Sequence, residues 1–142
     1  MSKMVNLICG PNGSGKTQKL IDHANAELQN TNGLIVFIDK YDKHRLSIDK
    51  QIRFINAKEF ALDNENKFFG FLCGILAGNY DINRIYIDNV KTIANIQDTE
   101  GINSILTKIR KLSAMHEVEF YLTLGSEDAQ NLDEKELNLQ TV

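Results

Sequence analysis

Eight residues close to the N-terminus bring together the groups that phosphate binding requires. They read GPNGSGKT and follow the apolar run MVNLIC, residues 4–9. Glycine lets successive backbone N–H groups approach an anion, and a helix that starts within the motif adds the positive end of its dipole. A lysine there can reach the β- and γ-phosphates, and a hydroxyl can ligate magnesium. The sequence therefore predicts a phosphate site formed by Gly10, Pro11, Asn12, Gly13, Ser14, Gly15, Lys16 and Thr17.

A carboxylate that could complete this site follows a second apolar run. Residues 84–88, RIYID, predict a strand that ends on Asp88. An acid at the carboxyl edge of a parallel sheet can hold the water shell of magnesium beside a phosphate loop. We therefore assign Thr17 and Asp88 to the metal, with Asp39, which also ends a predicted strand, as the rival acid. The competing interpretation of these aspartates is a helix cap or a turn residue.

Strands and helices alternate along the chain. Short, largely apolar runs predict strands over residues 4–9, 33–39, 52–57, 84–88 and 118–125. Helical spacing of apolar residues predicts helices over 16–29 and 101–115 and one or two helical pieces over 58–78, while the C-terminal run ELNLQTV alternates like a half-exposed edge strand. Residues 67–78 are apolar on almost every face, which favours burial against the sheet or a partner. This order predicts an α/β fold with a parallel sheet and right-handed crossovers.

Length and composition restrict the classes of protein. A chain of 142 residues is expected to form one domain, residues 1–142, with a real core. A hydrophobic share of 42% without any run of membrane-spanning length is typical of a soluble protein, and we expect no membrane partner. The N-terminus has no secretory cleavage pattern, so we expect a cytoplasmic protein in which Cys9 and Cys73 are buried thiols. The net charge of −3 gives no support for nucleic-acid binding.

The spacing G-x-x-x-x-G-K-[ST] in residues 10–17 is the Walker A pattern, and the chain resembles the P-loop NTPase superfamily there. Over roughly residues 4–126 the order of its segments looks like the ATPase core of RecA-like recombinases and their KaiC-like relatives. The resemblance implies a three-layer parallel sheet of RecA-like strand order, with one strand inserted between the loop strand and the Asp88 strand. It also implies ATP and Mg²⁺ as ligands, and a homo-oligomer or another protein partner that completes the site. Thymidine kinases have a similar core and are the second choice.

The chain departs from these families at the group that would activate water. Asn89 stands where many P-loop ATPases have glutamate, and Tyr41 stands where the recombinase pattern places its glutamate. An amide cannot accept a proton at neutral pH, and tyrosine is a poor base. We therefore expect slow or partner-dependent hydrolysis, with Lys16, Asp42 and Glu127 as the candidate catalytic residues. By the same resemblance, Ser126 is the candidate sensor of the γ-phosphate.

Three functions remain open on the sequence. The first is a weak ATPase, and the second is a kinase that phosphorylates a nucleoside or another small molecule, with Asp42 or Glu127 accepting the hydroxyl proton. The third is an ATP-binding regulatory module that does not hydrolyse its ligand. The chain shows neither the cysteine-based zinc module nor the long substrate lasso of a thymidine kinase, which disfavours the second. The basic stretch over residues 40–53 either receives a phosphate or an acidic partner, or is a solvated charged loop.

Overall fold

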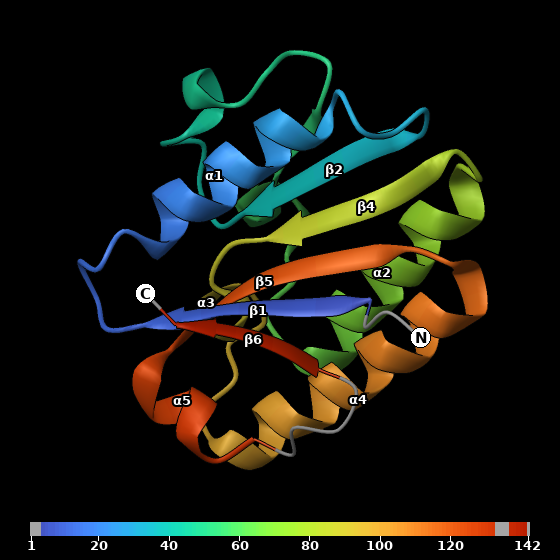
Figure 1. Ribbon diagram of the computed structural model, residues 1–142. Coiled ribbons are helices and arrows are strands. Elements are labelled where there is room, and N and C mark those ends of the chain that lie inside the picture. The colour runs from blue at the N-terminus through green and yellow to red at the C-terminus, as the bar shows by residue number, and fades with distance from the viewer. Residues whose placement is uncertain (1–3, 133–136, 142) are drawn as a thin grey trace.

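A computed structural model describes residues 4–132 and 137–141, in which six parallel strands form one sheet (Figure 1). Across the sheet the strands follow the order β3-β2-β4-β5-β1-β6. Their bounds are β1 Val5–Gly10, β2 Leu34–Asp39, β3 Arg53–Asn56, β4 Ile82–Ile87, β5 Glu119–Gly125 and β6 Leu137–Thr141. Because all pairs are parallel, the carboxyl ends of the strands meet at one edge of the sheet.

Helices cover both faces of this sheet, so that the fold has three layers (Figure 1). Helix α1, Lys16–Glu27, packs Leu20, Ile21 and Ala24 on one face against buried strand residues that include Phe37 and Tyr86. The opposite face carries α2, Glu65–Gly78, and α4, Thr99–His116, in a larger apolar cluster. The remaining helical pieces are η1 Arg45–Ser47, η2 Ala57–Phe60, α3 Val90–Ile93 and α5 Ser126–Gln130.

The register places β5 between β1 and β4. Leu122 of β5 pairs with Leu7 of β1 on one side and with Ile87 of β4 on the other. The loop after β1 and the residues after β4 are therefore one strand apart at the carboxyl edge. An α/β fold with a parallel sheet is thus confirmed, and a strand does separate the loop strand from the Asp88 strand.

The expected elements are present, together with short helical pieces that were not expected. The strands and the helices over 16–29, 58–78 and 101–115 are confirmed to within a few residues, whereas η1, α3 and α5 were not expected. The C-terminal strand β6 is confirmed as an edge strand paired with β1. Each new helix has a single turn or little more, and so short a segment shows no hydrophobic period. Helix α3 follows the end of β4 and helix α5 follows the end of β5, so both lie at the carboxyl edge of the sheet.

The sequence predicts burial of residues 67–78 and of both cysteines, and the structure confirms this only in part. Helix α2 buries Phe68, Leu72 and Leu76, which recur at intervals of four, while the rest of the helix is half-buried or exposed. Cys9 is buried, but Cys73 on α2 is only half-buried. In the part of the chain that the structure describes, none of the helices combines the length and the apolar content that crossing a membrane requires.

Candidate functional site

The glycine-rich loop, residues 11–15, joins β1 to α1 at the carboxyl edge of the sheet. Gly13 and Gly15 have φ values of 80° and 90°, in the left-handed region that a side chain disfavours. A Cβ atom at either position would meet nothing within 4 Å, so the backbone conformation and not space requires glycine there. Gly15 is the N-cap of α1 and has no side chain in front of the first N–H groups of the helix. These backbone donors are therefore open to an anion.

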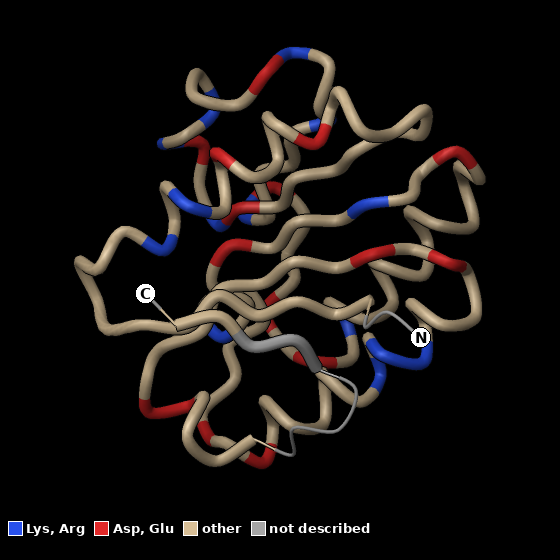
Figure 2. Tube along the Cα trace, viewed as in Figure 1, with Lys and Arg blue, Asp and Glu red and all other residues tan. Residues whose placement is uncertain are grey.

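Lys16 lies back over this loop. Its Nζ atom donates a hydrogen bond of 2.8 Å to the carbonyl oxygen of Gly10, the last residue of β1. The ammonium is thereby held at the same end of the sheet as the open N–H groups of α1. Figure 2 shows basic positions at the start of α1 and acidic positions on α5 at this edge. The loop, the helix start and the ammonium together form an electropositive corner.

Thr17, Asp88 and Thr123 form a hydrogen-bonded group next to this corner. The Thr17 hydroxyl lies 3.1 Å from each carboxylate oxygen of Asp88, to which it donates. The buried Thr123 hydroxyl donates to Oδ1 of Asp88 at 2.8 Å and accepts the backbone N–H of Asn89 at 2.7 Å. Three elements, α1, β5 and the end of β4, thus fix one carboxylate beside the loop. The sequence indicated Thr17 and Asp88 but missed Thr123, whose only signal is a hydroxyl in the apolar run FYLTLG.

Asp39 ends the neighbouring strand β2 and is as buried as Asp88, each being 7% exposed. Its Oδ1 accepts the backbone N–H of Lys40, whereas Oδ2 is buried and has no hydrogen-bond partner among the described residues. Burial, and then the charge of Asp88, raise the pKa of Asp39, although hydrogen bonds from the backbone and the nearby His44 act in the opposite direction. Of the two rival acids, Asp88 accepts a hydrogen bond from Thr17, whereas Asp39 is a second buried carboxyl that is affected by the charge of Asp88.

A pocket of about 930 Å³ opens beside these groups. It is lined by most of the residues that the sequence assigned to the phosphate site, together with Asp88 and the start of α5. The assigned residues on its wall are Pro11, Asn12, Gly13, Gly15, Lys16, Thr17, Asp88, Ser126 and Glu127. Gly10 and Ser14 are not among the lining residues, and neither is Asp42, which is exposed in the loop after β2. The structure therefore gathers Ser126 and Glu127 beside the loop but leaves Asp42 outside the pocket.

The two positions that lack glutamate have other roles in the structure. Asn89 adopts a φ of 64°, and its side-chain oxygen accepts the backbone N–H of Thr92, so it caps α3. Tyr41 is 51% exposed, and its ring lies 5.4 Å from the ammonium of Lys58. Neither side chain can serve as a carboxylate base, as the sequence indicated.

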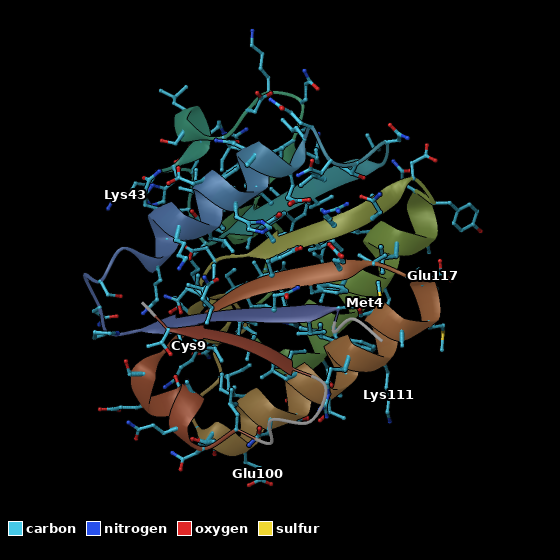
Figure 3. All side chains as sticks on the ribbon, viewed as in Figure 1. Met4, Cys9, Lys43, Glu100, Lys111 and Glu117 are labelled. Carbon is cyan, nitrogen blue, oxygen red and sulfur yellow. The ribbon has the colours of Figure 1, made fainter. Side chains whose placement is uncertain are left out.

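Further charged groups reach the pocket from three segments. Lys43 and His44, from the basic stretch, line it, and Figure 3 shows Lys43 at the end of the molecule where the strands finish. Lys91 of α3 forms an ion pair of 3.3 Å with Asp128 of α5, whose side chain is 13% exposed. The sequence of the basic stretch is compatible both with a phosphate ligand and with a solvated loop.

Arg84 lies far from this edge. It stands near the start of β4, where Nε is 3.0 Å from Glu27 at the end of α1 and 3.3 Å from Glu119 at the start of β5. Its side chain is 15% exposed. Arg84 therefore pairs with two acids of its own chain, at the edge of the sheet opposite the glycine-rich loop.

The oxygen atoms beside the loop suit magnesium. Magnesium prefers oxygen ligands and is usually held by one or two carboxylates together with substrate phosphates and water. Thr17 supplies a hydroxyl and Asp88 a carboxylate, while Oδ2 of Asp39 is a buried acceptor without a partner among the described residues. Within residues 4–132 and 137–141, no three His, Cys, Asp or Glu side chains gather to hold a metal alone. Thr17 and Asp88 are the residues that could hold a magnesium ion together with phosphate oxygens and water.

Comparison of the chain with models of known protein families and with curated proteins gave no match.

Proposed function

We propose that this chain is a small ATP-binding protein of the P-loop NTPase superfamily, with a RecA-like strand order and weak or partner-dependent Mg-ATPase activity. The observation that carries the proposal is the contact of Thr17 with Asp88, at 3.1 Å, beside the glycine-rich loop. A hydroxyl and a carboxylate joined in this way can share one magnesium ion, the hydroxyl directly and the acid through water.

The strand order supports the same proposal. In RecA-like cores a strand separates the loop strand from the strand that ends on the metal-holding acid, and here β5 separates β1 from β4. Helices lie on both faces of the sheet, as a three-layer P-loop fold requires. The Walker A spacing, the strand before it and the helix after it therefore agree with the wider topology.

Each residue near the loop then has a task. The N–H groups of the loop and of α1 bind the phosphate chain, and Lys16 exchanges the Gly10 carbonyl for phosphate oxygens. Thr17 and Asp88 would hold magnesium, which when bound supplies positive charge at the β- and γ-phosphates. Thr123 keeps Asp88 in position by its hydrogen bond of 2.8 Å. Ser126, at the start of α5, lies on the pocket wall and would contact the terminal phosphate.

Hydrolysis requires a water molecule to attack the γ-phosphorus while the bond to the β-phosphate oxygen breaks. Glu127 lies on the pocket wall and is the candidate that accepts the proton of this water. Asn89 and Tyr41 offer no carboxylate, so the candidate base Glu127, in the first turn of a short helix, has to be positioned. We therefore expect slow turnover by the chain alone, and faster turnover if a partner completes the site.

A regulatory module that binds ATP without hydrolysing it is the second candidate. The use of the Asn89 side chain to cap α3, together with the exposure of Tyr41, favours this function over an efficient ATPase. A kinase for a small molecule would differ from both, because ADP release would depend on an acceptor.

Phosphate release over several hours, with Mg·ATP in excess, tests the proposed activity. We expect the wild type to turn over well below about 1 s⁻¹, which is the lower end of typical kcat values. We expect Glu127→Gln to lower the rate of the wild type at least tenfold. Exposed Glu59→Gln is the matched control and should leave the rate unchanged. Release that continues unchanged in Glu127→Gln would overturn the role of Glu127, and ADP formation only with an added nucleoside would favour a kinase.

A further inference from the structure

Most side chains that line the pocket beside the glycine-rich loop are polar or charged. The pocket volume of about 930 Å³ is enough for a whole nucleotide. Sites that hold the organic part of a ligand are usually lined by hydrophobic and aromatic side chains. Among the described residues that line this pocket, Pro11 is the only hydrophobic side chain, and the His44 ring is the only aromatic one. A base that enters the pocket therefore has little surface on which to stack.

The Phe and Tyr side chains of the described residues are not part of the pocket lining. Phe37 and Tyr86 are fully buried under α1, and Tyr121 stacks on Tyr86 with 4.6 Å between ring centroids. Tyr41 is close in sequence to pocket residues, but its ring faces the ammonium of Lys58 and is not part of the pocket wall. Stacking on an aromatic ring is worth about 1–3 kcal/mol per base, and this contribution is not provided by the described residues of the pocket.

Cations, in contrast, reach the pocket from separate segments. Lys16 begins α1, while Lys43 and His44 follow β2, which is separated from β1 by two other strands. Lys43 is exposed, so its ammonium can move onto a ligand, whereas Lys91 is already paired with Asp128. A chain of phosphates is the part of a nucleotide that several cations can bind together.

We propose that the pocket recognises the triphosphate chain and not the base, with Lys43 and His44 as phosphate ligands in addition to the glycine-rich loop. This inference rests on the proposed nucleotide site and specifies its substrate class. The substrates would be nucleoside triphosphates with any base, because the affinity comes from phosphate oxygens that all of them share.

Equilibrium binding of five magnesium complexes tests the inference: those of ATP, GTP, CTP, UTP and inorganic tripolyphosphate. We expect the four nucleotides to bind within about threefold of one another, and tripolyphosphate to bind within about tenfold of ATP. Binding of one nucleotide at least tenfold more tightly than the other three would overturn the inference and leave the proposed function standing. Failure of all five ligands to bind would overturn the proposed function as well.

Two lysine variants distinguish phosphate binding by Lys43 from a general effect of positive charge in the same loop. Lys43→Gln should weaken all five ligands by a similar factor of about 5 to 10, so that the ratio of ATP to GTP affinity stays constant. Lys50→Gln removes a cation from the same loop but outside this pocket, and should change no affinity more than twofold. Equal behaviour of the two variants would contradict the assignment of Lys43, as would a loss of ATP binding without a loss of tripolyphosphate binding.

Discussion

Thr17 and Asp88 are 71 positions apart in the sequence, yet the hydroxyl of Thr17 lies 3.1 Å from both carboxylate oxygens of Asp88. The first residue belongs to the first turn of α1 and the second directly follows β4. The strand between them in the sheet, β5, supplies Thr123 to the same carboxylate. The contact therefore depends on the strand order, because it forms only where β1, β5 and β4 end side by side.

Thr123→Val tests how Asp88 is held. Valine fills a similar volume but neither donates to Asp88 nor accepts the N–H of Asn89. Because two buried polar groups lose a partner, we expect a loss of about 2 kcal/mol in the free energy of unfolding. We also expect about tenfold weaker Mg·ATP binding, with little change in ATP binding in EDTA. Chemical denaturation and calorimetric titration measure the two effects.

Ser113→Ala is the control for that variant. Ser113 is buried in α4 and donates to the carbonyl oxygen of Val118, away from the pocket. Its loss should lower stability by about 1 kcal/mol and leave nucleotide affinity unchanged. Equal nucleotide affinities of Thr123→Val and the wild type, with magnesium present, would show that Thr123 does not position Asp88.

Gly15→Ala tests the backbone of the glycine-rich loop. Gly15 has a φ of 90°, and left-handed backbone costs alanine about 1–2 kcal/mol. The variant should lose stability by about that amount or move the loop, and in either case bind ATP more weakly. Gly74→Ala adds the same methyl group to the interior of α2, where nothing lies within 4 Å, and should gain about 0.5–1 kcal/mol. A fully stable Gly15→Ala protein with wild-type affinity would contradict this account.

Asp39→Asn tests the buried pair of acids. Burial and the charge of Asp88 raise the pKa of Asp39 above its usual 3.8, so its ionised form destabilises the fold. The stabilising contribution of the protonated form is fully present below pH 3.8 and is lost as the pH rises through the folded-state pKa. In EDTA at pH 7 the variant should therefore be more stable than the wild type, by about 1 kcal/mol.

The pH dependence of that difference is the discriminating measurement. The advantage of Asp39→Asn should shrink as the pH falls through the raised pKa and vanish near the usual value of 3.8. Asp81→Asn changes an exposed acid and should stay within about 0.5 kcal/mol of the wild type. If the advantage of Asp39→Asn were absent at pH 7, the carboxyl of Asp39 would not be strained by burial and by Asp88.

Much of the site could be predicted because its signals are local. The spacing of residues 10–17 and the apolar run before them predict a loop between a strand and a helix, and β1 and α1 have these positions. Asp88 could also be predicted from a local signal, since it ends a run of strand-forming residues. In both cases the groups involved are close together in the sequence or lie at the end of one element.

The remaining features depend on contacts between distant segments. Thr123 bonds Asp88 because β4 and β5 pair in a particular register, and nothing within FYLTLG fixes that register. The closeness of Asp39 to Asp88 depends likewise on the pairing of β2 with β4. Helix α3 is too short for a hydrophobic period to be seen, although the Asn89 side chain caps it.

The affinity for ATP, measured by calorimetry with magnesium and with EDTA for the wild type and Lys16→Ala, tests the central claim most directly. Lys16→Ala should bind Mg·ATP about 10- to 100-fold more weakly, since a charge-assisted hydrogen bond contributes about 1.5–3 kcal/mol. Lys19→Ala, in the same helix but outside the pocket lining, should bind like the wild type. The wild type should also bind ATP at least tenfold more tightly with magnesium than in EDTA. A folded wild type without detectable ATP binding, or equal affinities for wild type and Lys16→Ala, would contradict the account.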